Sequence, residues 1–558
     1  MEKILLLGIN ARFTHTNLAI RYLRNYVVEL PYQTVIKEVT IKQTPFAILQ
    51  EIWKINPQIL AISVYIWNVE IVKVLLPDIK KVLPKVILLL GGPEVSFNGS
   101  DWLRNYPEID YIIAGFGETG FKYFLENRKI LTEKIIKISN PHFSEIPFPY
   151  RDEDFPEIND KYVYYEASRG CAFRCSYCLS SRNDQKLEFR KITDVKNELN
   201  FLLSKKVKII KFIDRTFNSN SQFSREIWKF LSNLETQTKF HFEIHPSFLQ
   251  EEDFSILKKI KPGIFQFEIG IQSVNPKAIS AIHRKDDWQK SKKNIFRLVK
   301  MANIHLHVDL IVGLPYDTFS EIINSFNEIF ELQAHHFQLG FLKILTGTPL
   351  QEEKDKFGIL YSESAPYQVL QTKWLNYEEI ILLQKIEKLL NIYYNSEKFV
   401  RTLKELVTEF EHPFAFFREL LGFFEDNHFD FIIKNWQKNA FHLLKFIQSK
   451  LPDRSGFFID CLRYDWCKIA GSHYYPDFIR SSEIDDFRRK NYLLIKQKIE
   501  EKNSHFGLQL KKAVFFKPFG LQLKKAVFFK PLTEEFKKKY PEEKNITIFF
   551  PNGKKLIL

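Results

Sequence analysis

Short apolar runs alternate with amphipathic helical stretches through the first 140 residues of this 558-residue chain. The runs, which end in Gly or polar turns, are residues 3–9, 59–65, 86–92 and 111–115. Runs that are apolar along their whole length are typical of strands buried on both faces, and helices between such strands make the sheet parallel. The pattern therefore predicts an α/β, doubly wound (Rossmann-like) domain over residues 1–140, with ligands at the carboxyl ends of its strands.

A proline-rich linker is predicted at residues 141–158, and a second series of strands follows it. The six strand candidates of this series are residues 162–168, 208–214, 239–245, 264–273, 305–313 and 336–344. Helical stretches separate them, so we expect a partial (β/α)6 barrel of the TIM type over residues 159–360, with its chemistry at the carboxyl ends of the strands. Amphipathic helices rich in aromatic residues then predict a mostly helical domain over residues 361–558.

The tail of the last domain is basic and repetitive. Residues 506–518 recur without change at 519–531, which we interpret as a recent tandem duplication in which one copy forms a strand. The final residues predict a β-hairpin that turns at Asn552 and Gly553. The net charge is +14, but residues 501–558 hold 13 Lys and 5 Glu and so contribute 13 − 5 = +8 of it. A basic tail is compatible with a nucleic-acid partner, but no other feature of the sequence supports one.

Three of the five cysteines, Cys171, Cys175 and Cys178, lie within eight residues directly after the first predicted barrel strand. Three thiolates can hold three irons of a cubane cluster and leave the fourth iron open to an external ligand. Zinc is the alternative, but a structural zinc site needs a fourth ligand, and no His occurs within sixty residues after Cys178. Cys461 and Cys467 are six positions apart on a predicted helix, so they point in different directions and are expected to be buried thiols. The C-x3-C-x2-C spacing therefore favours an iron–sulfur cluster.

Cysteine content and hydropathy also indicate where the chain functions. Five cysteines without a paired framework indicate a reducing, cytoplasmic location. No stretch approaches the roughly 18 to 20 apolar residues that span a bilayer. The first apolar run is interrupted at Gly8, and we expect it to be a buried strand rather than a signal peptide.

With these three cysteines on the loop after the first strand of a six-unit barrel, the chain resembles the radical S-adenosylmethionine (SAM) superfamily. The resemblance implies a 4Fe–4S cluster on the three cysteines, with the open iron chelated by the amine and carboxylate of SAM. It also implies reductive cleavage of SAM to a 5′-deoxyadenosyl radical, and an external electron donor of the flavodoxin or ferredoxin kind. Tyr177 matches the aromatic residue whose backbone meets the adenine in that family.

Polar residues at the ends of the later strands match positions that contact SAM in this family. Glu243 ends the third strand candidate, Gln272 ends the fourth, and Arg284 follows twelve residues later. The resemblance implies that these groups contact the methionine moiety and ribose, with Arg284 paired with the carboxylate. Asp309 begins a segment similar to the motif that lies near the ribose and adenine. The second strand lacks the usual Gly-Gly-Glu type of ending, and Asp214 is the candidate there.

The N-terminal domain is similar to that of the cobalamin-binding subfamily of these enzymes. The similarity rests on the loops at residues 10–24, 91–99 and 115–120. The last of these, GFGETG, also fits a dinucleotide fingerprint, but it follows a late strand instead of the first. One departure is clear: no Asp of this domain has a His two residues later, so the D-x-H-x-x-G motif that ligates cobalt from below is missing. Cobalamin can bind without that ligand, and we expect His15 to form hydrogen bonds rather than to ligate cobalt.

The resemblance covers nearly the whole chain and implies cobalamin-dependent methylation, or a related radical modification, of an unidentified substrate. The C-terminal domain resembles an uncharacterised extension, and no catalytic residue can be named. One alternative is a cobalamin-free enzyme similar to tRNA methylthiotransferases, but those carry three further N-terminal cysteines and residues 1–170 contain none. The other alternative, a non-catalytic nucleic-acid-binding protein, rests on the Lys-rich tail alone.

Overall fold

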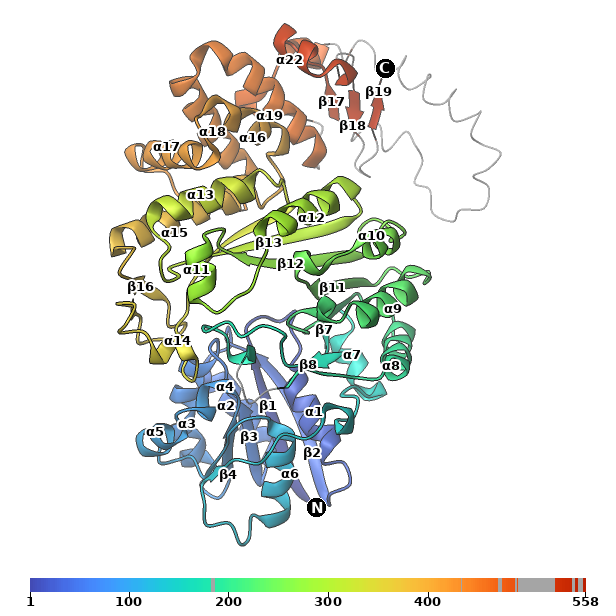
Figure 1. The fold of residues 1–558 in the computed structure, drawn as a ribbon, viewed down its shortest axis with the longest axis vertical. Coiled ribbons are helices and arrows are strands. Elements are labelled where there is room, and N and C mark those ends of the chain that lie inside the picture. Colours follow the sequence, from blue (N-terminus) through green and yellow to red (C-terminus); the bar gives the residue numbers. More distant parts are fainter. Residues whose placement is uncertain are drawn as a thin grey trace. The chain divides into compact units, whose positions relative to one another are not determined.

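The computed structural model describes residues 1–181, 186–432, 434–469, 474–486, 489, 527–543, 547–549 and 555–557. The chain divides into two compact units. The first holds residues 1–334 and 338–380 and contains two six-stranded sheets (Figure 1). The second holds residues 335–337 and 381–558.

The first sheet confirms the predicted doubly wound domain. Its strand order is β2-β1-β3-β4-β5-β6, and all neighbouring strands are parallel. The strands are β1 (Glu2–Asn10), β2 (Tyr32–Thr40), β3 (Ile59–Ser63), β4 (Ile87–Gly91), β5 (Tyr111–Ile113) and β6 (Ile135–Ile136). Successive residues of β1 point to opposite faces, so Leu5 and Leu7 belong to one apolar core while Ile4 and Leu6 belong to another.

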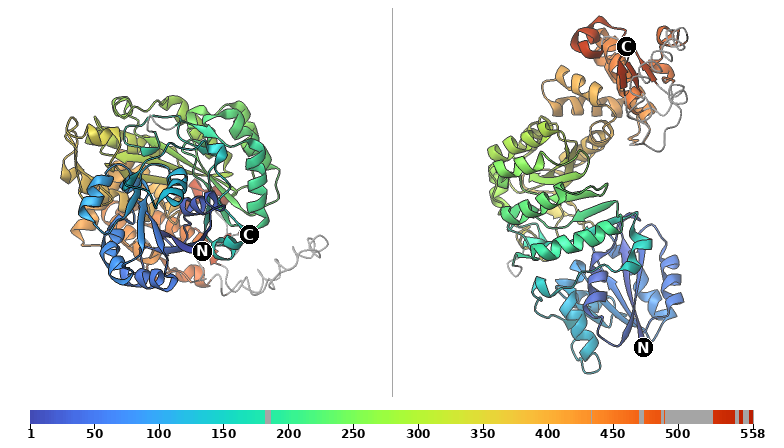
Figure 2. Two further views of the ribbon diagram at one scale, coloured as in Figure 1. Left: turned by 90° about the horizontal axis from the view of Figure 1, so that it is seen from below. Right: turned by 90° about the vertical axis from the view of Figure 1, so that its right-hand side faces the viewer.

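Helices cover both faces of this sheet (Figure 2). Helices α2 (Pro45–Ile55) and α3 (Val69–Val82) pack on one core, and α1 (Leu18–Tyr26) and α6 (Gly117–Asn127) pack on the other. The short α4 (Pro93–Ser96) and α5 (Gly99–Asn105) follow β4. Burial on both faces is the reason why the central strands are apolar along their whole length.

Two strands of this sheet, β2 and β6, lie outside the set that the sequence predicts. Strand β2 neighbours only β1 and mixes polar with apolar residues, most of which are half-buried, and β6 has two residues. Because an edge strand is less completely buried than a central one, its sequence has no continuous apolar run.

The second sheet confirms the predicted partial barrel. Its order is β14-β13-β12-β11-β10-β7, and the helices between its strands lie on one side of it (Figures 1 and 2). The strands are β7 (Tyr162–Tyr165), β10 (Ile209–Phe212), β11 (Lys239–Glu243), β12 (Phe265–Gln272), β13 (Ile304–Val312) and β14 (His336–Phe341). The connecting helices are α8 (Ile192–Ser204), α9 (Ser221–Ser232), α10 (Glu251–Leu257), α11 (Pro276–Ala281), α12 (Trp288–Met301) and α13 (Phe319–Phe330).

Burial alternates along the central strands of this sheet. In β12, for example, Phe267 and Ile269 are buried, whereas Glu268 and Gln272 on the opposite face are half-buried. The polar face therefore carries the side chains that are available for a site. Shorter elements complete this unit: α7 (Phe155–Ile158), α14 (Pro349–Glu352), β15 (Leu360–Tyr361) and β16 (Val369–Gln371).

The second unit confirms the predicted mostly helical C-terminal region. Among the described residues, its helices include α15 (Tyr377–Tyr393), which begins in the first unit, α16 (Val400–Leu406), α17 (Pro413–Asp426), α18 (Trp436–Lys450), α19 (Ser455–Ile469) and α22 (Glu534–Lys539). Cys461 and Cys467 are both buried in α19, as expected.

A small antiparallel sheet closes the second unit, in the order β17 (Val527–Phe529), β18 (Thr547–Phe549) and β19 (Lys555–Ile557). The pairing of β18 with β19 confirms the predicted hairpin, and its turn lies outside the described residues. The second copy of the repeat forms β17, and the first copy also lies outside the described residues. Among the helices that are described, none is both long and apolar enough to cross a membrane.

Candidate functional site

The three cysteines lie on a loop that begins directly after β8 (Ser168–Arg169), which pairs with β9 (Glu188–Phe189). Gly170 starts the loop at φ +97°, where a Cβ atom would lie 2.5 Å from the carbonyl oxygen of Lys186, so only glycine fits this turn. Ser176 fixes the far part of the loop: its N–H donates to Ile282 O at 2.9 Å, and its carbonyl accepts from Leu350 N at 2.9 Å. The loop is therefore held from both sides.

Polar groups lie beside the sulfurs of Cys171 and Cys175. The N–H of Phe173 donates to Cys171 Sγ at 3.4 Å, and Thr216 Oγ1 lies 3.8 Å from the same sulfur. Arg284 Nη1 donates to Cys175 Sγ at 3.8 Å. Burial raises the pKa of the Cys175 thiol, and Arg284 opposes this shift. Donors of this kind stabilise thiolates, which are the form that binds iron.

A single metal ion does not fit the described side chains. In the part of the chain that the structure describes, no three His, Cys, Asp or Glu side chains converge to hold one ion. A cubane cluster has a different requirement, since each cysteine binds its own iron. The donor set of three thiolates on one loop meets that requirement.

Arg284 and Gln272 lie together at the end of β12. Arg284 Nη2 donates to Gly270 O at 2.7 Å, and its guanidinium lies 5.0 Å from the centre of the Phe173 ring. Gln272 has φ +73° at a shift in the register between β12 and β13. Its buried Oε1 accepts no hydrogen bond from the described residues, so an acceptor is left for a ligand.

Tyr177 occupies the cysteine loop itself, where its ring is half-buried. Burial raises the pKa of Tyr177 well above its usual value; Cys175 raises it further and Arg284 opposes the shift. The contact of Tyr177 with adenine stays a prediction.

Glu243 and Asp309 lie on the polar face of the sheet. Glu243 Oε1 is 3.8 Å from Arg215 Nη1, and burial raises the pKa of Glu243 to about 7 against the opposing effect of Arg215. Asp309 Oδ1 is 3.0 Å from His307 Nε2, and burial raises the pKa of Asp309. Arg215 and His307 were not assigned from the sequence, although Arg215 directly follows Asp214 at the same strand end.

Asp214 has a different environment from the other predicted residues. Its side chain is buried, and its two carboxylate oxygens accept from Ala167 N at 3.1 Å and Ser168 Oγ at 2.5 Å. Burial raises the pKa of Asp214 to about 7, and the two donors oppose this shift. Asp214 thus ties β10 to the segment that leads into the cysteine loop, and this geometry favours positioning over direct contact with SAM.

Replacing Asp214 by asparagine is expected to lower the apparent free energy of unfolding by about 1–3 kcal/mol, because one of its two donors is left without an acceptor. Urea-induced unfolding measures this change. Asp194→Asn, at an exposed position on α8, is the control and should have no measurable effect. Equal stability of the two variants would show that Asp214 does not anchor the loop.

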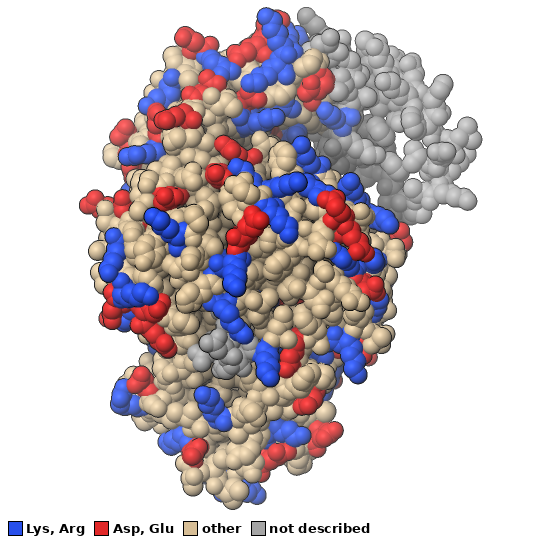
Figure 3. Space-filling view, in the orientation of Figure 1, with Lys and Arg blue, Asp and Glu red and all other residues tan. Residues whose placement is uncertain are grey.

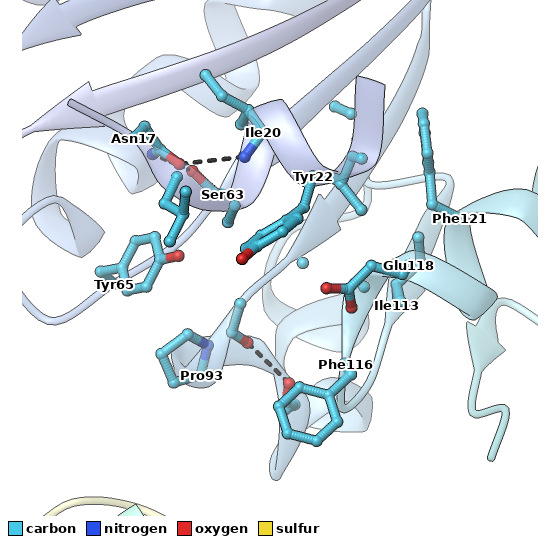
Figure 4. A pocket seen from close by; sticks show the side chains of 18 of the residues that line it. Asn17, Ile20, Tyr22, Ser63, Tyr65, Pro93, Ile113, Phe116, Glu118 and Phe121 are labelled. Atoms are coloured by element: carbon cyan, nitrogen blue, oxygen red, sulfur yellow. Dashed lines mark hydrogen bonds between the residues drawn. The ribbon is translucent and has the colours of Figure 1, made fainter. Parts of the chain in front are cut away.

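A second candidate site is a cavity of about 690 Å³ at the carboxyl ends of the first sheet. The chain adds β2 on one side of β1 and β3 on the other, so the strand order reverses at β1. Doubly wound folds bind their ligands at such a reversal. The cavity is lined by residues at or just after the ends of the strands, including Asn10, Ser63, Gly92 and Glu118. Figure 4 shows Ser63 and Glu118 among them. Residues of the barrel, among them Tyr164, Glu166 and Arg169, form the rest of its wall.

Gly92 brings the backbone close to this cavity. It has φ +105°, and a Cβ atom there would lie 2.5 Å from the carbonyl oxygen of Val64. No other residue can occupy this position without moving the end of β3. The predicted loops at residues 10–24, 91–99 and 115–120 all contribute to the lining.

His15 belongs to the wall of the cavity. Its Nδ1 is 2.5 Å from Tyr164 Oη, its ring contacts Tyr162 edge-on, and burial lowers its pKa. This geometry agrees with the prediction that His15 forms hydrogen bonds.

Family models match three consecutive parts of the chain. Residues 4–125 match the B12 binding domain, residues 165–329 match the radical SAM superfamily, and residues 355–549 match a protein of unknown function, DUF4080. These matches confirm the predicted combination of domains and the cofactors that belong to it: a 4Fe–4S cluster and SAM for the second domain, and cobalamin for the first.

Curated relatives are distant. The cobalamin-dependent radical SAM methyltransferase TokK of Streptomyces tokunonensis is 22% identical over 346 residues, which are 55% of this chain and 50% of that protein. A tRNA-2-methylthio-N(6)-dimethylallyladenosine synthase of Thermodesulfovibrio yellowstonii is 24% identical over 260 residues, 45% of this chain and 58% of that protein. The chain thus spans about half the length of these relatives.

Solved structures show the same fold. OxsB, a cobalamin-dependent SAM radical enzyme solved with aqua-cobalamin, matches with a TM-score of 0.56 at 15% identity, over 98% of this chain and 85% of that one. TsrM from Kitasatospora setae, solved with cobalamin and a 4Fe-4S cluster, matches with a TM-score of 0.54 at 14% identity, over 65% of this chain and 76% of that one. The chain therefore carries a B12-binding domain and a radical SAM domain, followed by a domain of unknown function.

Proposed function

We propose that this chain is a cobalamin-dependent radical SAM enzyme that methylates, or otherwise modifies by a radical route, an unactivated carbon of its substrate. One observation carries the proposal: the cavity of the B12-binding domain and the cysteine loop share a wall. Arg169 lines the cavity, and Cys171 follows it by two residues. A cobalamin in the cavity and a cluster on the cysteine loop would therefore lie close enough to act on the same substrate.

The residues around the cysteines suit the proposed cofactors. The three thiolates would hold the cluster, Arg284 would pair with the carboxylate of SAM, and Gln272 and Glu243 would accept hydrogen bonds from its donors. When bound, the cluster and SAM supply a 5′-deoxyadenosyl radical, and methylcobalamin supplies a methyl group. The chain's own part is to bind and orient these groups and to exclude water from them.

The cavity suits cobalamin in three respects. It lies at the end of a doubly wound sheet, where such folds bind ligands. At Gly92 the backbone itself lines the cavity, because no side chain fits there. The rest of the lining is mostly apolar with a few polar groups. The D-x-H-x-x-G motif is missing from this domain, so we propose that cobalamin is bound here without a protein ligand to cobalt.

The two alternatives have less support. A B12-binding domain at residues 4–125 and the absence of cysteine from residues 1–170 both favour cobalamin over a second cluster of the methylthiotransferase kind. On the face drawn in Figure 3, basic and acidic side chains are interspersed among the described residues. That mixture does not resemble the basic stripe of a nucleic-acid site. We also propose a reducing, cytoplasmic location and an external one-electron donor of the flavodoxin or ferredoxin kind.

Hydroxocobalamin binding tests the proposal. Protein reconstituted anaerobically with iron and sulfide is expected to hold about four irons per chain and to co-elute with cobalamin absorbance in gel filtration. A brown protein that never retains cobalamin would support the cobalamin-free alternative. A colourless zinc protein would overturn the whole proposal.

A further inference from the structure

Glu118 places an unused hydrogen-bond acceptor in the cavity of the B12-binding domain. It is 5% exposed near the start of α6, and it extends into the same open space as Tyr22 (Figure 4). Its Oε1 accepts from Arg169 Nη2 at 3.0 Å. Its Oε2 accepts no hydrogen bond from the residues that the structure describes.

Arg169 holds Glu118 in this position. Arg169 also donates from Nε and Nη2 to Glu166 at 3.0 and 2.8 Å. Its guanidinium lies 5.5, 4.8 and 5.0 Å from the ring centres of Tyr22, Phe116 and Phe143, which shield its remaining nitrogen from solvent. Because the arginine is fixed by a carboxylate and three rings, Glu118 is fixed with it.

Charge balance shows what kind of ligand this wall can accept. Two carboxylates, Glu118 and Glu166, share one guanidinium, so the wall has a surplus negative charge. The lysine that lines the cavity, Lys137, is exposed. The second carboxylate oxygen of Glu118 faces the cavity, so an anionic ligand group beside it would be repelled, whereas an N–H or O–H donor would be attracted. The wall therefore favours an N–H or O–H donor from the ligand.

We propose that Glu118 accepts a hydrogen bond from a peripheral carboxamide of the bound corrinoid, and that Arg169 is the positioning residue for Glu118. This inference rests on the proposed function, since it takes the cavity to be the cobalamin site. Primary carboxamides surround the corrin ring and are neutral donors, which this wall favours. Glu118 thus selects which carboxamide faces α6 and so sets the rotation of the ring about its axis.

Cobalamin monocarboxylic acids, in which one carboxamide is replaced by a carboxylate, test the inference directly. Wild-type protein is expected to bind one isomer roughly tenfold or more weakly than hydroxocobalamin, because two carboxylates then oppose each other. Glu118→Gln should recover binding of that same isomer, since its amide donates to the carboxylate. Equilibrium absorbance titration measures both affinities without any turnover. Glu126→Gln, at an exposed position on the same helix, should leave the ranking of isomers unchanged.

Arg169→Lys tests the positioning role. A lysine cannot reach Glu118 and Glu166 together, so hydroxocobalamin should bind roughly tenfold more weakly. Arg128→Lys is the matched control: its side chain is also 13% exposed, and it pairs with Glu2 at the opposite end of the sheet. If wild-type protein binds every isomer equally, or if Glu118→Gln does not change their ranking, the inference is wrong while the proposed function stands. If wild-type protein binds no cobalamin, the proposed function fails first.

Discussion

Replacing Cys175 by alanine is expected to abolish iron binding and, with it, the reductive cleavage of SAM. The protein should fall from about four irons per chain to less than one, because a cubane held by two thiolates on a short loop is not retained. Cys175 is the buried cysteine of the three and the one that Arg284 contacts. Iron analysis, the brown absorbance band and the formation of 5′-deoxyadenosine with a chemical reductant measure the outcome.

Cys467→Ala is the control for this variant, since Cys467 is a buried cysteine in α19 with no part in the loop. It should lose stability by about 1–2 kcal/mol through the cavity that it leaves, but it should keep its iron. Retention of a full cluster in Cys175→Ala would show that other residues hold the iron, and the assignment of the loop would then be wrong.

The sequence predicts the fold where burial leaves a continuous pattern. The central strands β1, β3 and β4 are buried on both faces, so each forms an apolar run that stands out from its neighbours. Strand β2 lies at the edge, and pairs of polar residues interrupt its apolar ones, so it forms no such run. The limit is therefore physical: a pattern of hydropathy reports burial, and an edge strand is only half-buried.

The site shows a similar limit. Cys171, Cys175 and Cys178 could be recognised because their spacing is local. The pair of Glu118 and Arg169 could not, because the residues are 51 positions apart and only the folded chain joins them. Asp214 lies between these cases: its position at a strand end could be predicted, but the direction of its side chain, toward Ala167 and Ser168, depends on packing.

The polar face of the barrel suggests a pH-dependent affinity for SAM that depends on Glu243. The carboxyl has a pKa of about 7, since burial and the nearby Glu268 and Asp309 favour its neutral form while Arg215 and Lys211 oppose them. Glu243 accepts a hydrogen bond with both oxygens only when it is ionised. Lowering the pH from 7.5 to 6 is therefore expected to weaken SAM binding roughly tenfold.

Glu243→Gln should remove this pH dependence and bind SAM roughly 10- to 100-fold more weakly at pH 7.5, the range expected for one hydrogen bond to a charged group. Isothermal titration calorimetry at several pH values measures the affinity of each protein for SAM. The ionisation of SAM itself affects both proteins equally, so the difference between their pH profiles reports the ionisation of Glu243. Glu252→Gln, on the exposed side of α10, should behave like the wild type.

Stability provides an independent check on the same group. Because the pKa of Glu243 is raised in the folded state, the folded protein holds a proton that the unfolded chain has lost between about pH 4.5 and pH 7. The wild type should therefore lose stability relative to Glu243→Gln as the pH rises through this window. A variant that keeps the wild-type pH dependence of both SAM affinity and stability would show that another group titrates, and Asp309, whose pKa burial also raises, would be the next to replace.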